Sequence, residues 1–275
     1  TLPCPFVRFF PTAQDALDKQ ATKPITTHMK KPPHRSILLS QDHTSLTREQ
    51  IRAYFHETSD VYEALFTVLN SDQAYWVKPI ALRHPLIFYY GHTHTFFMNK
   101  LILAGLITER INPQFESMFA VGVDEMGWDD VNEAHYQWPT PAEVKAYRAQ
   151  VRDVVDQLIT RLPFDLPIDW ESPWWPILMG IEHERIHLET SSVLIRQHAL
   201  EYVQSASAWA PCTALQVAAP DNSVVKIPAR EIVLRKSAAY YGWDNEYGQF
   251  QTHCPAFQAA KYLKIHTRRA SKLLD

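Results

Sequence analysis

The sequence predicts a mainly α protein, with a four-helix bundle over residues 45–207 and a short β-rich segment over residues 208–275. Three observations support this prediction. Apolar residues recur at three- and four-residue spacing over several long stretches, as on helices with one buried face. Two of these stretches begin with N-terminal capping motifs. Past Pro211 the pattern changes to short apolar runs between turn residues, which is typical of strands. Residues 1–44 are rich in proline and predict an irregular leader.

The first two helices follow from local signals. One is expected at about residues 48–70, where Thr47 can cap the first turn and Gln50, three residues on, completes a capping box. The next is expected at residues 85–105, because its apolar run begins at a proline and ends at a glycine. His92 lies in the middle of this second helix.

A long ordered loop is expected between the second and third helices, at residues 110–138. Asn112-Pro113 is one of its turn signals, and a loop of this length is more often functional than idle. The third helix has the clearest start in the chain. Thr140 is at the N-cap, Pro141 at the first helical position and Glu143 at the third.

The fourth helix is expected over residues 173–204, and a domain boundary over residues 205–212. Beyond that boundary, residues 215–217 and 231–234 predict short strands, and residues 242–246 predict a turn. The remainder is too short for a large independent core.

Composition excludes several classes of protein. The chain has 27 basic and 30 acidic residues, a net charge of -3, which indicates neither nucleic acid nor an anionic membrane as partner. No apolar run approaches the roughly eighteen residues of a membrane helix. Three scattered cysteines give no disulfide framework and indicate a reducing cytoplasm, and no signal peptide is expected. Only seven glycines, without a Rossmann or P-loop fingerprint, argue against nucleotide binding.

The most informative stretch is His183-Glu-Arg-Ile-His187 on the fourth helix. Two histidines four residues apart lie on one face of a helix, so both imidazoles can reach one metal ion. Charged neighbours also allow a plainer interpretation, in which the pair lies on a solvated face. Ile177 and Leu194 on the histidine side favour a pair that points inward, and buried histidines need partners.

The same five residues match the H-E-x-x-H signature of zinc metalloproteases. In that interpretation Glu184 is the general base on a zinc-bound water, and a downstream residue such as Glu201 is the third ligand. Arg185 is unusual there, and no third histidine lies at the metzincin offset. A zinc metallohydrolase therefore stays an alternative, as does a non-catalytic bundle that binds metal or nothing.

A different ligand set takes its third member from the second helix. His92 and His94 are two residues apart, diverge by roughly 200° on a helix, and cannot both face one site. His94 is then expected at the surface or against a loop. Three neutral imidazoles leave three positions of an octahedral ion open for substrates and O2. Ligand type alone does not choose among iron, zinc, nickel and copper.

Several stretches together resemble a known family. They are Gly91-His92-Thr93 with Phe96-Phe97, residues 119–135 and residues 180–192. In these stretches the chain resembles the DinB-like iron-binding domain of the sulfoxide synthases, nonhaem iron enzymes of ergothioneine and ovothiol biosynthesis. Ile186 stands where the ergothioneine enzymes tend to have glutamine, which favours the ovothiol branch, whose product is 5-histidylcysteine sulfoxide.

The resemblance covers roughly residues 35–262. Residues 240–258 look like the opening of the family's second domain, which is similar to formylglycine-generating enzyme. Residues 264–275 do not continue the pattern, so a C-terminally truncated form is expected. The family activity is therefore expected of the parent enzyme rather than of this chain alone.

The resemblance implies Fe(II) held by His92, His183 and His187. It implies an oxidoreductase that uses O2 to join the sulfur of cysteine to an imidazole carbon of histidine and to oxidise that sulfur. Neutral ligands leave the ion its full charge, which favours a thiolate substrate. The expected partners are these small molecules, with no nucleic acid and no membrane.

Other candidate residues lie outside the ligand set. Arg83 could contact a substrate carboxylate, and Asp124 and Trp128 lie on the long loop, either as substrate contacts or as parts of a capped surface turn. Glu184 is a candidate for supporting the ligands. For Glu182 and Glu184 the preferred interpretation is nevertheless that of solvated helix charges, because glutamate is rarely buried.

Overall fold

The computed structural model describes residues 47–120, 136–209, 221–237 and 241–262. These residues form two compact units, which are described separately below. One contains residues 47–209 together with Tyr241 and is helical. The other contains residues 221–237 and 242–262 and is built from strands. The leader and the strand expected at 215–217 lie outside the described residues.

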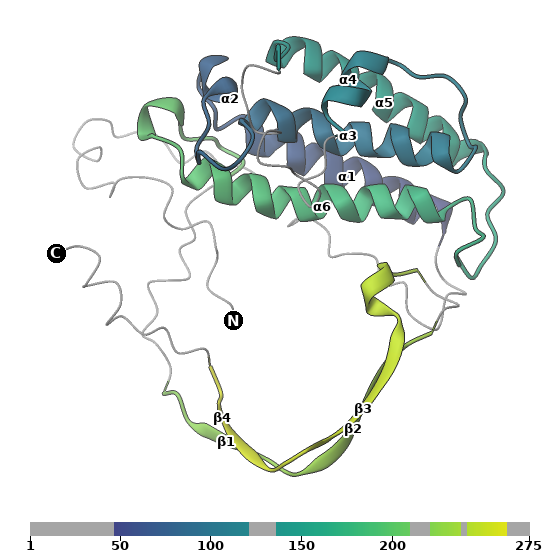
Figure 1. Cartoon of the computed structure of the whole chain (residues 1–275), viewed down its shortest axis with the longest axis vertical. Coiled ribbons are helices and arrows are strands. Elements are labelled where there is room, and N and C mark those ends of the chain that lie inside the picture. Colours follow the sequence, from purple (N-terminus) through teal and green to yellow (C-terminus); the bar gives the residue numbers. More distant parts are fainter. Residues whose placement is uncertain (1–46, 121–135, 210–220, 238–240, 263–275) are drawn as a thin grey trace, which may run out of the picture. The chain divides into compact units, whose positions relative to one another are not determined.

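Four long helices form the helical unit, as the sequence predicts (Figure 1). Helix α3 packs against α5 and α6, and α1 packs against the same two helices. The short helix α2 lies between α1 and α3, the short helix α4 lies between α3 and α5, and the 3-10 turn η3 follows α6. No helix among the described residues has the length and apolarity to span a bilayer. The bounds are α1 Arg48–Phe66, α2 Gln73–Trp76, α3 Leu86–Leu103, α4 Pro113–Met118, α5 Pro141–Arg161, α6 Trp175–Arg196 and η3 Leu200–Tyr202.

Both predicted capping boxes are present. The Thr47 side chain accepts a hydrogen bond from the Gln50 backbone, and the Gln50 side chain accepts one from the Thr47 backbone. Thr140 and Glu143 make the same reciprocal pair at the start of α5. Each box satisfies two backbone N–H groups that the first helical turn leaves without partners. The capping motifs in the sequence therefore predict the first residue of both helices correctly.

Helix ends were predicted less well. Helix α1 ends at Phe66 rather than near residue 70, and α6 ends at Arg196 rather than near residue 204. The segments that follow pair with each other through an isolated antiparallel bridge between Leu69 and Val203. The Gln204 amide also donates to the Val68 carbonyl at 2.7 Å. Tertiary hydrogen bonds thus replace helical ones at both ends.

The predicted loop at residues 110–138 begins with a helix. Asn112 caps α4, its side-chain oxygen accepting from the Phe115 amide at 3.1 Å, and Pro113 takes the first helical position. The sequence predicts a turn at this asparagine–proline pair, but the same two residues equally suit a capped helix start. Residues 121–135 of this loop lie outside the described part of the chain.

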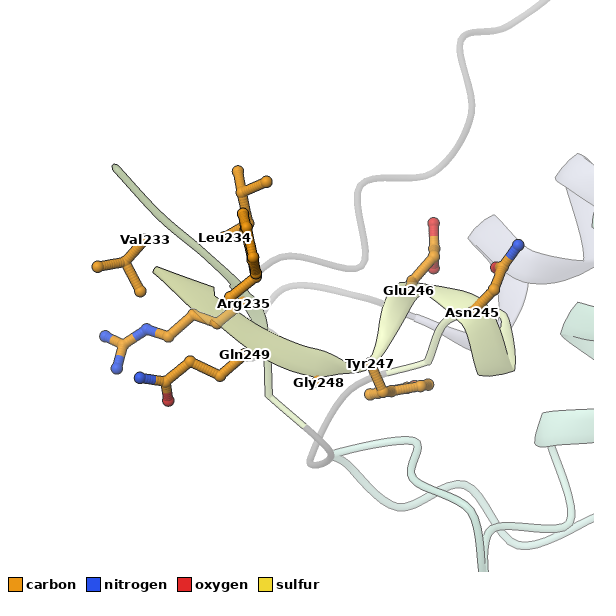
Figure 2. Close-up of a pocket in the computed structure, with 9 residues that line it drawn as sticks. Val233, Leu234, Arg235, Asn245, Glu246, Tyr247, Gly248 and Gln249 are labelled. Atoms are coloured by element: carbon orange, nitrogen blue, oxygen red, sulfur yellow. The ribbon is translucent and has the colours of Figure 1, made fainter. Parts of the chain in front are cut away.

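The strand unit holds two antiparallel pairs: β1 Val224–Ile227 with β4 Phe257–Ala260, and β2 Arg230–Lys236 with β3 Gly248–Cys254. The predicted strand at 231–234 lies within β2, and the predicted turn contains the 3-10 helix η5 Asp244–Glu246. An open pocket follows β2, η5 and β3, and Figure 2 shows the register partners Arg235 and Gln249 extending the same way. The apolar strand residues that line this pocket, Val233, Leu234 and Phe250, are exposed.

Candidate metal centre

Three histidines from two helices meet inside the helical unit. His92 comes from α3, and His183 and His187 come from α6. One ligand nitrogen of each lies within 4.8 Å of the other two, and it is the one such group of three potential metal ligands found among the described residues. The three ring centroids are 4.4–5.0 Å apart. The structure therefore brings together the three residues expected from the sequence.

Two glycines allow the close packing that forms the site. At Gly180, one turn before His183, an added Cβ would lie 2.1 Å from the ring of Phe97 on α3. At Gly91, beside His92, an added Cβ would lie 2.5 Å from the ring of Phe119. Contacts this short are sterically forbidden, so glycine is required for this approach of α3 to its neighbours.

The ring nitrogens of the three histidines differ in their hydrogen bonding. His92 Nδ1 lies 2.6 Å from the Phe119 carbonyl oxygen, and because a carbonyl only accepts, Nδ1 donates. Its Nε2 then keeps a free lone pair. The Nδ1 atoms of His183 and His187 are buried with no hydrogen-bond partner in the described structure. Buried polar atoms rarely stay unpaired, and a metal ion at this cluster would give the imidazoles a partner.

Aromatic rings hold the imidazoles in place. Phe96 stacks on His183 with centroids 3.7 Å apart and an interplanar angle of 10°. Phe88 stacks on His92 at 5.1 Å, and Tyr89 lies 6.1 Å from His187. Such packing restricts the ring rotamers before any ion binds, which lowers the ordering cost of coordination.

Burial also keeps the three histidines neutral. It lowers the pKa of His92, lowers that of His183 well below its usual value, and lowers that of His187 to about 3. The neighbouring imidazoles add to the effect for His183 and His187. A neutral imidazole has the lone pair that a metal needs, so the site is ready to coordinate at neutral pH.

Glu184 differs from its preferred interpretation as a solvated charge. It is fully buried, and its Oε1 accepts from Thr93 Oγ1 at 3.2 Å and from Arg148 Nη2 at 2.9 Å. Burial raises the pKa of Glu184, while Arg148 acts in the opposite direction. The carboxylate is also absent from the group of potential ligands found in the described chain. The expectation for Glu182 also needs revision, because it is half-buried and accepts from the Tyr54 hydroxyl at 2.7 Å.

Arg148 was missed by the sequence interpretation. It is 1% exposed and lies on the buried face of α5, between Val144 and Val151. A charged residue within an apolar stripe is the signal that could have identified it, because charges are buried only when paired. His94, expected near the surface, is also buried, with Nδ1 3.5 Å from Glu184 Oε1.

Three predicted substrate-binding residues remain, and the structure describes one of them, Arg83. Arg83 is half-buried just before α3, and its guanidinium lies close enough to Tyr89 to oppose the rise that burial causes in the tyrosine pKa. Since Tyr89 neighbours His187, Arg83 is one residue removed from the histidines. Asp124 and Trp128 lie outside the described residues.

The fold and the matched sequence define the class of protein. The DinB superfamily matches residues 54–191, half of the chain and the part that contains all three histidines, so the chain belongs to this superfamily. A curated relative is "Ergothioneine biosynthesis protein 1" of Neurospora crassa, 28% identical over 199 residues. The match covers 66% of this chain but 22% of the relative, so the chain spans about a fifth of that protein's length.

Proposed function

We propose that His92, His183 and His187 bind Fe(II), and that the chain supplies the metal-binding domain of a nonhaem iron sulfoxide synthase. The convergence of three neutral imidazoles, those of His92 and His187 buried and that of His183 half-buried, is the observation that carries the proposal. Similarity to a protein named for ergothioneine biosynthesis supports the same class of sulfur and histidine chemistry. Because the chain spans only part of that relative, the complete reaction is proposed for the parent enzyme.

The proposed reaction joins cysteine to histidine. The thiol loses its hydrogen, the imidazole carbon loses its hydrogen, and a C–S bond forms. One oxygen atom of O2 goes to sulfur, giving the sulfoxide, and the other leaves as water with both hydrogens. When bound, Fe(II) supplies O2 activation and a charge that favours the thiolate. The chain's own imidazoles hold the ion, and the Phe96 and Phe88 rings exclude water from beside them.

Ile186 supports the ovothiol branch, with histidine as the ring substrate. It precedes His187 and is 49% exposed, so its apolar side chain is available to a substrate or to another part of the parent enzyme. We assign Arg83, Asp124 and Trp128 as substrate contacts, Arg83 through a carboxylate. We also assign the strand unit to the opening of a second domain similar to formylglycine-generating enzyme, and the cytoplasm as the site of action.

The position of Glu184 argues against the zinc hydrolase alternative. A general base must reach a water on the metal, whereas Glu184 is fully buried and bonded to Arg148 and Thr93. Glu201, the suggested third ligand, is exposed on η3 and does not belong to the histidine group.

The activity is tested with the chain and with the parent polypeptide, each loaded anaerobically with Fe(II) and then given O2, cysteine and histidine. O2 consumption that requires both amino acids, with 5-histidylcysteine sulfoxide seen by mass spectrometry, is expected of the parent. Activity of the chain alone would show that the strand unit suffices. A parent that binds iron but makes no such product would contradict the proposed reaction.

A further inference from the structure

The guanidinium of Arg148 links all four long helices of the helical unit. Arg148 on α5 donates to the Glu63 carboxylate on α1 and to Glu184 on α6. It also donates to the Tyr90 carbonyl and the Thr93 hydroxyl on α3, both at 2.8 Å. These bonds are directional, and the group that makes them is almost completely buried.

Two of these partners are sequence neighbours of the metal ligands. Thr93 follows His92, and Glu184 follows His183. Thr93 also donates to Glu184 at 3.2 Å, so α3 and α6 are joined directly as well as through Arg148. Consecutive side chains on a helix point about 100° apart. Fixing the direction of one residue therefore fixes the direction of the histidine beside it.

We propose that Arg148 is a positioning residue for the metal centre. Its bonds to Thr93 and Glu184 set the rotation of α3 and α6 about their axes, and hence the spacing of the three imidazoles. The inference rests on the proposed function in that it takes the histidines to be metal ligands. It assigns the glutamate of the His-Glu-Arg-Ile-His stretch a part in this linkage instead of a part in catalysis.

A purely structural role would predict different behaviour. Buried ion pairs add little net stability, because apolar residues of similar volume often serve as well. Apolar packing restricts helix rotation less sharply than a planar guanidinium whose donors have fixed directions. A positioning role therefore predicts a change in metal coordination beyond what any loss of stability causes.

The test measures Co(II) binding, by its visible absorption and by competition with a chelator. Arg148→Lys keeps the charge but loses the planar set of donors, and we expect its Co(II) dissociation constant to rise about tenfold or more, with an altered absorption spectrum. Glu184→Gln keeps an oxygen that can accept from Arg148 and Thr93, so it should retain more affinity than Glu184→Ala.

Two matched controls separate positioning from stability. Arg152→Lys alters the arginine one turn further along α5, which bonds to His56 and Asp60 and contacts neither ligand helix in these bonds. Val155→Ala removes buried volume from the same helix and so reduces stability. Both should keep the wild-type Co(II) spectrum. If Arg148→Lys does not fold, the nearly isosteric variant Thr93→Val provides a milder change. We expect Thr93→Val to shift the Co(II) spectrum as well.

Three outcomes would overturn the inference. The first is wild-type affinity and spectrum in Arg148→Lys or, where that variant does not fold, in Thr93→Val. The second is an equal spectral change in Val155→Ala, which would assign the effect to stability alone. The third is a wild-type chain that binds no Co(II) or Fe(II), which would remove the proposed metal centre itself and is distinguished by the wild-type titration.

Discussion

His92 is oriented by a contact that no sequence pattern predicts. Its Nδ1 donates to the carbonyl of Phe119, a residue 27 positions away at the end of α4. The ring of Phe119 comes this close because Gly91 has no side chain. At the scale of single residues, a glycine, a phenylalanine and a backbone carbonyl thus determine which imidazole nitrogen faces the ligand group.

Gly91→Ala tests this local arrangement. The new Cβ would lie 2.5 Å from the Phe119 ring, so the ring must move, and we expect the hydrogen bond from His92 to the Phe119 carbonyl to weaken. We expect the free energy of unfolding to fall by about 1–3 kcal/mol, as for overpacked cores. Metal affinity should fall as well. Urea unfolding and a Co(II) titration measure the two effects, and unchanged values of both would contradict this role for the glycine.

Local signals also determine what the sequence could predict about the site. The sequence predicts that His183 and His187 share a helix face, because residues four apart in a helix lie one above the other. His92 and His94 differ only in which face they occupy, and the resemblance to sulfoxide synthases, not the spacing, favoured His92. Arg148 was not foreseen because burial of an arginine depends on partners from three other helices, which only the folded chain brings together.

At the scale of elements, the capping boxes made helix starts predictable, and long-range pairing made helix ends unpredictable. The strands were also partly missed. In β1 and β3 most residues are exposed, so no alternation of apolar and polar residues marks them. A strand without a buried face has no strong sequence signal, and only residues within β2 were recognised.

Helices α1 and α5 are joined by a charge network that gives a pH-dependent stability. The hydrogen bond from Arg52, aided by one from His56, lowers the pKa of Asp156 to about 2. A carboxyl whose folded-state pKa lies below its unfolded value of about 3.9 contributes stability that is complete above that value. The contribution is lost as the pH falls through the folded-state pKa.

Asp156→Asn should therefore lower the urea midpoint at neutral pH. The gap to wild type should narrow as the pH falls from about 4 towards 2, because wild type then loses the same ionised group. Asp153→Asn, which changes an exposed carboxylate on the same helix, is the matched control and should show little effect. A gap that stays constant down to pH 2 would contradict the assigned linkage.

For the molecule as a whole, the proposed metal centre lies entirely in the helical unit. All three histidines and the Arg148 linkage lie within residues 47–209. From the rest of the described chain this unit includes Tyr241, which lies 4.8 Å from Trp175. The metal centre should therefore not depend on the strands.

A chain that ends at residue 209 should keep the metal affinity of the full chain. Loss of the contact between Tyr241 and Trp175 should cost about 1 kcal/mol of stability, the usual value for one aromatic pair. A Co(II) titration and thermal unfolding of the shortened chain measure both quantities. Loss of metal binding in a shortened chain that remains folded would show that the strand unit contributes to the centre.

If three histidines from two helices form one metal centre, His92→Ala should bind Fe(II) more weakly than wild type under anaerobic conditions. Wild type should bind about one iron per chain, and the variant should lose about tenfold or more in affinity, because one of three ligands is gone. His198→Gln, which alters a buried histidine that donates to the Ala74 carbonyl, should bind like wild type. Full iron affinity in His92→Ala would contradict the three-histidine centre.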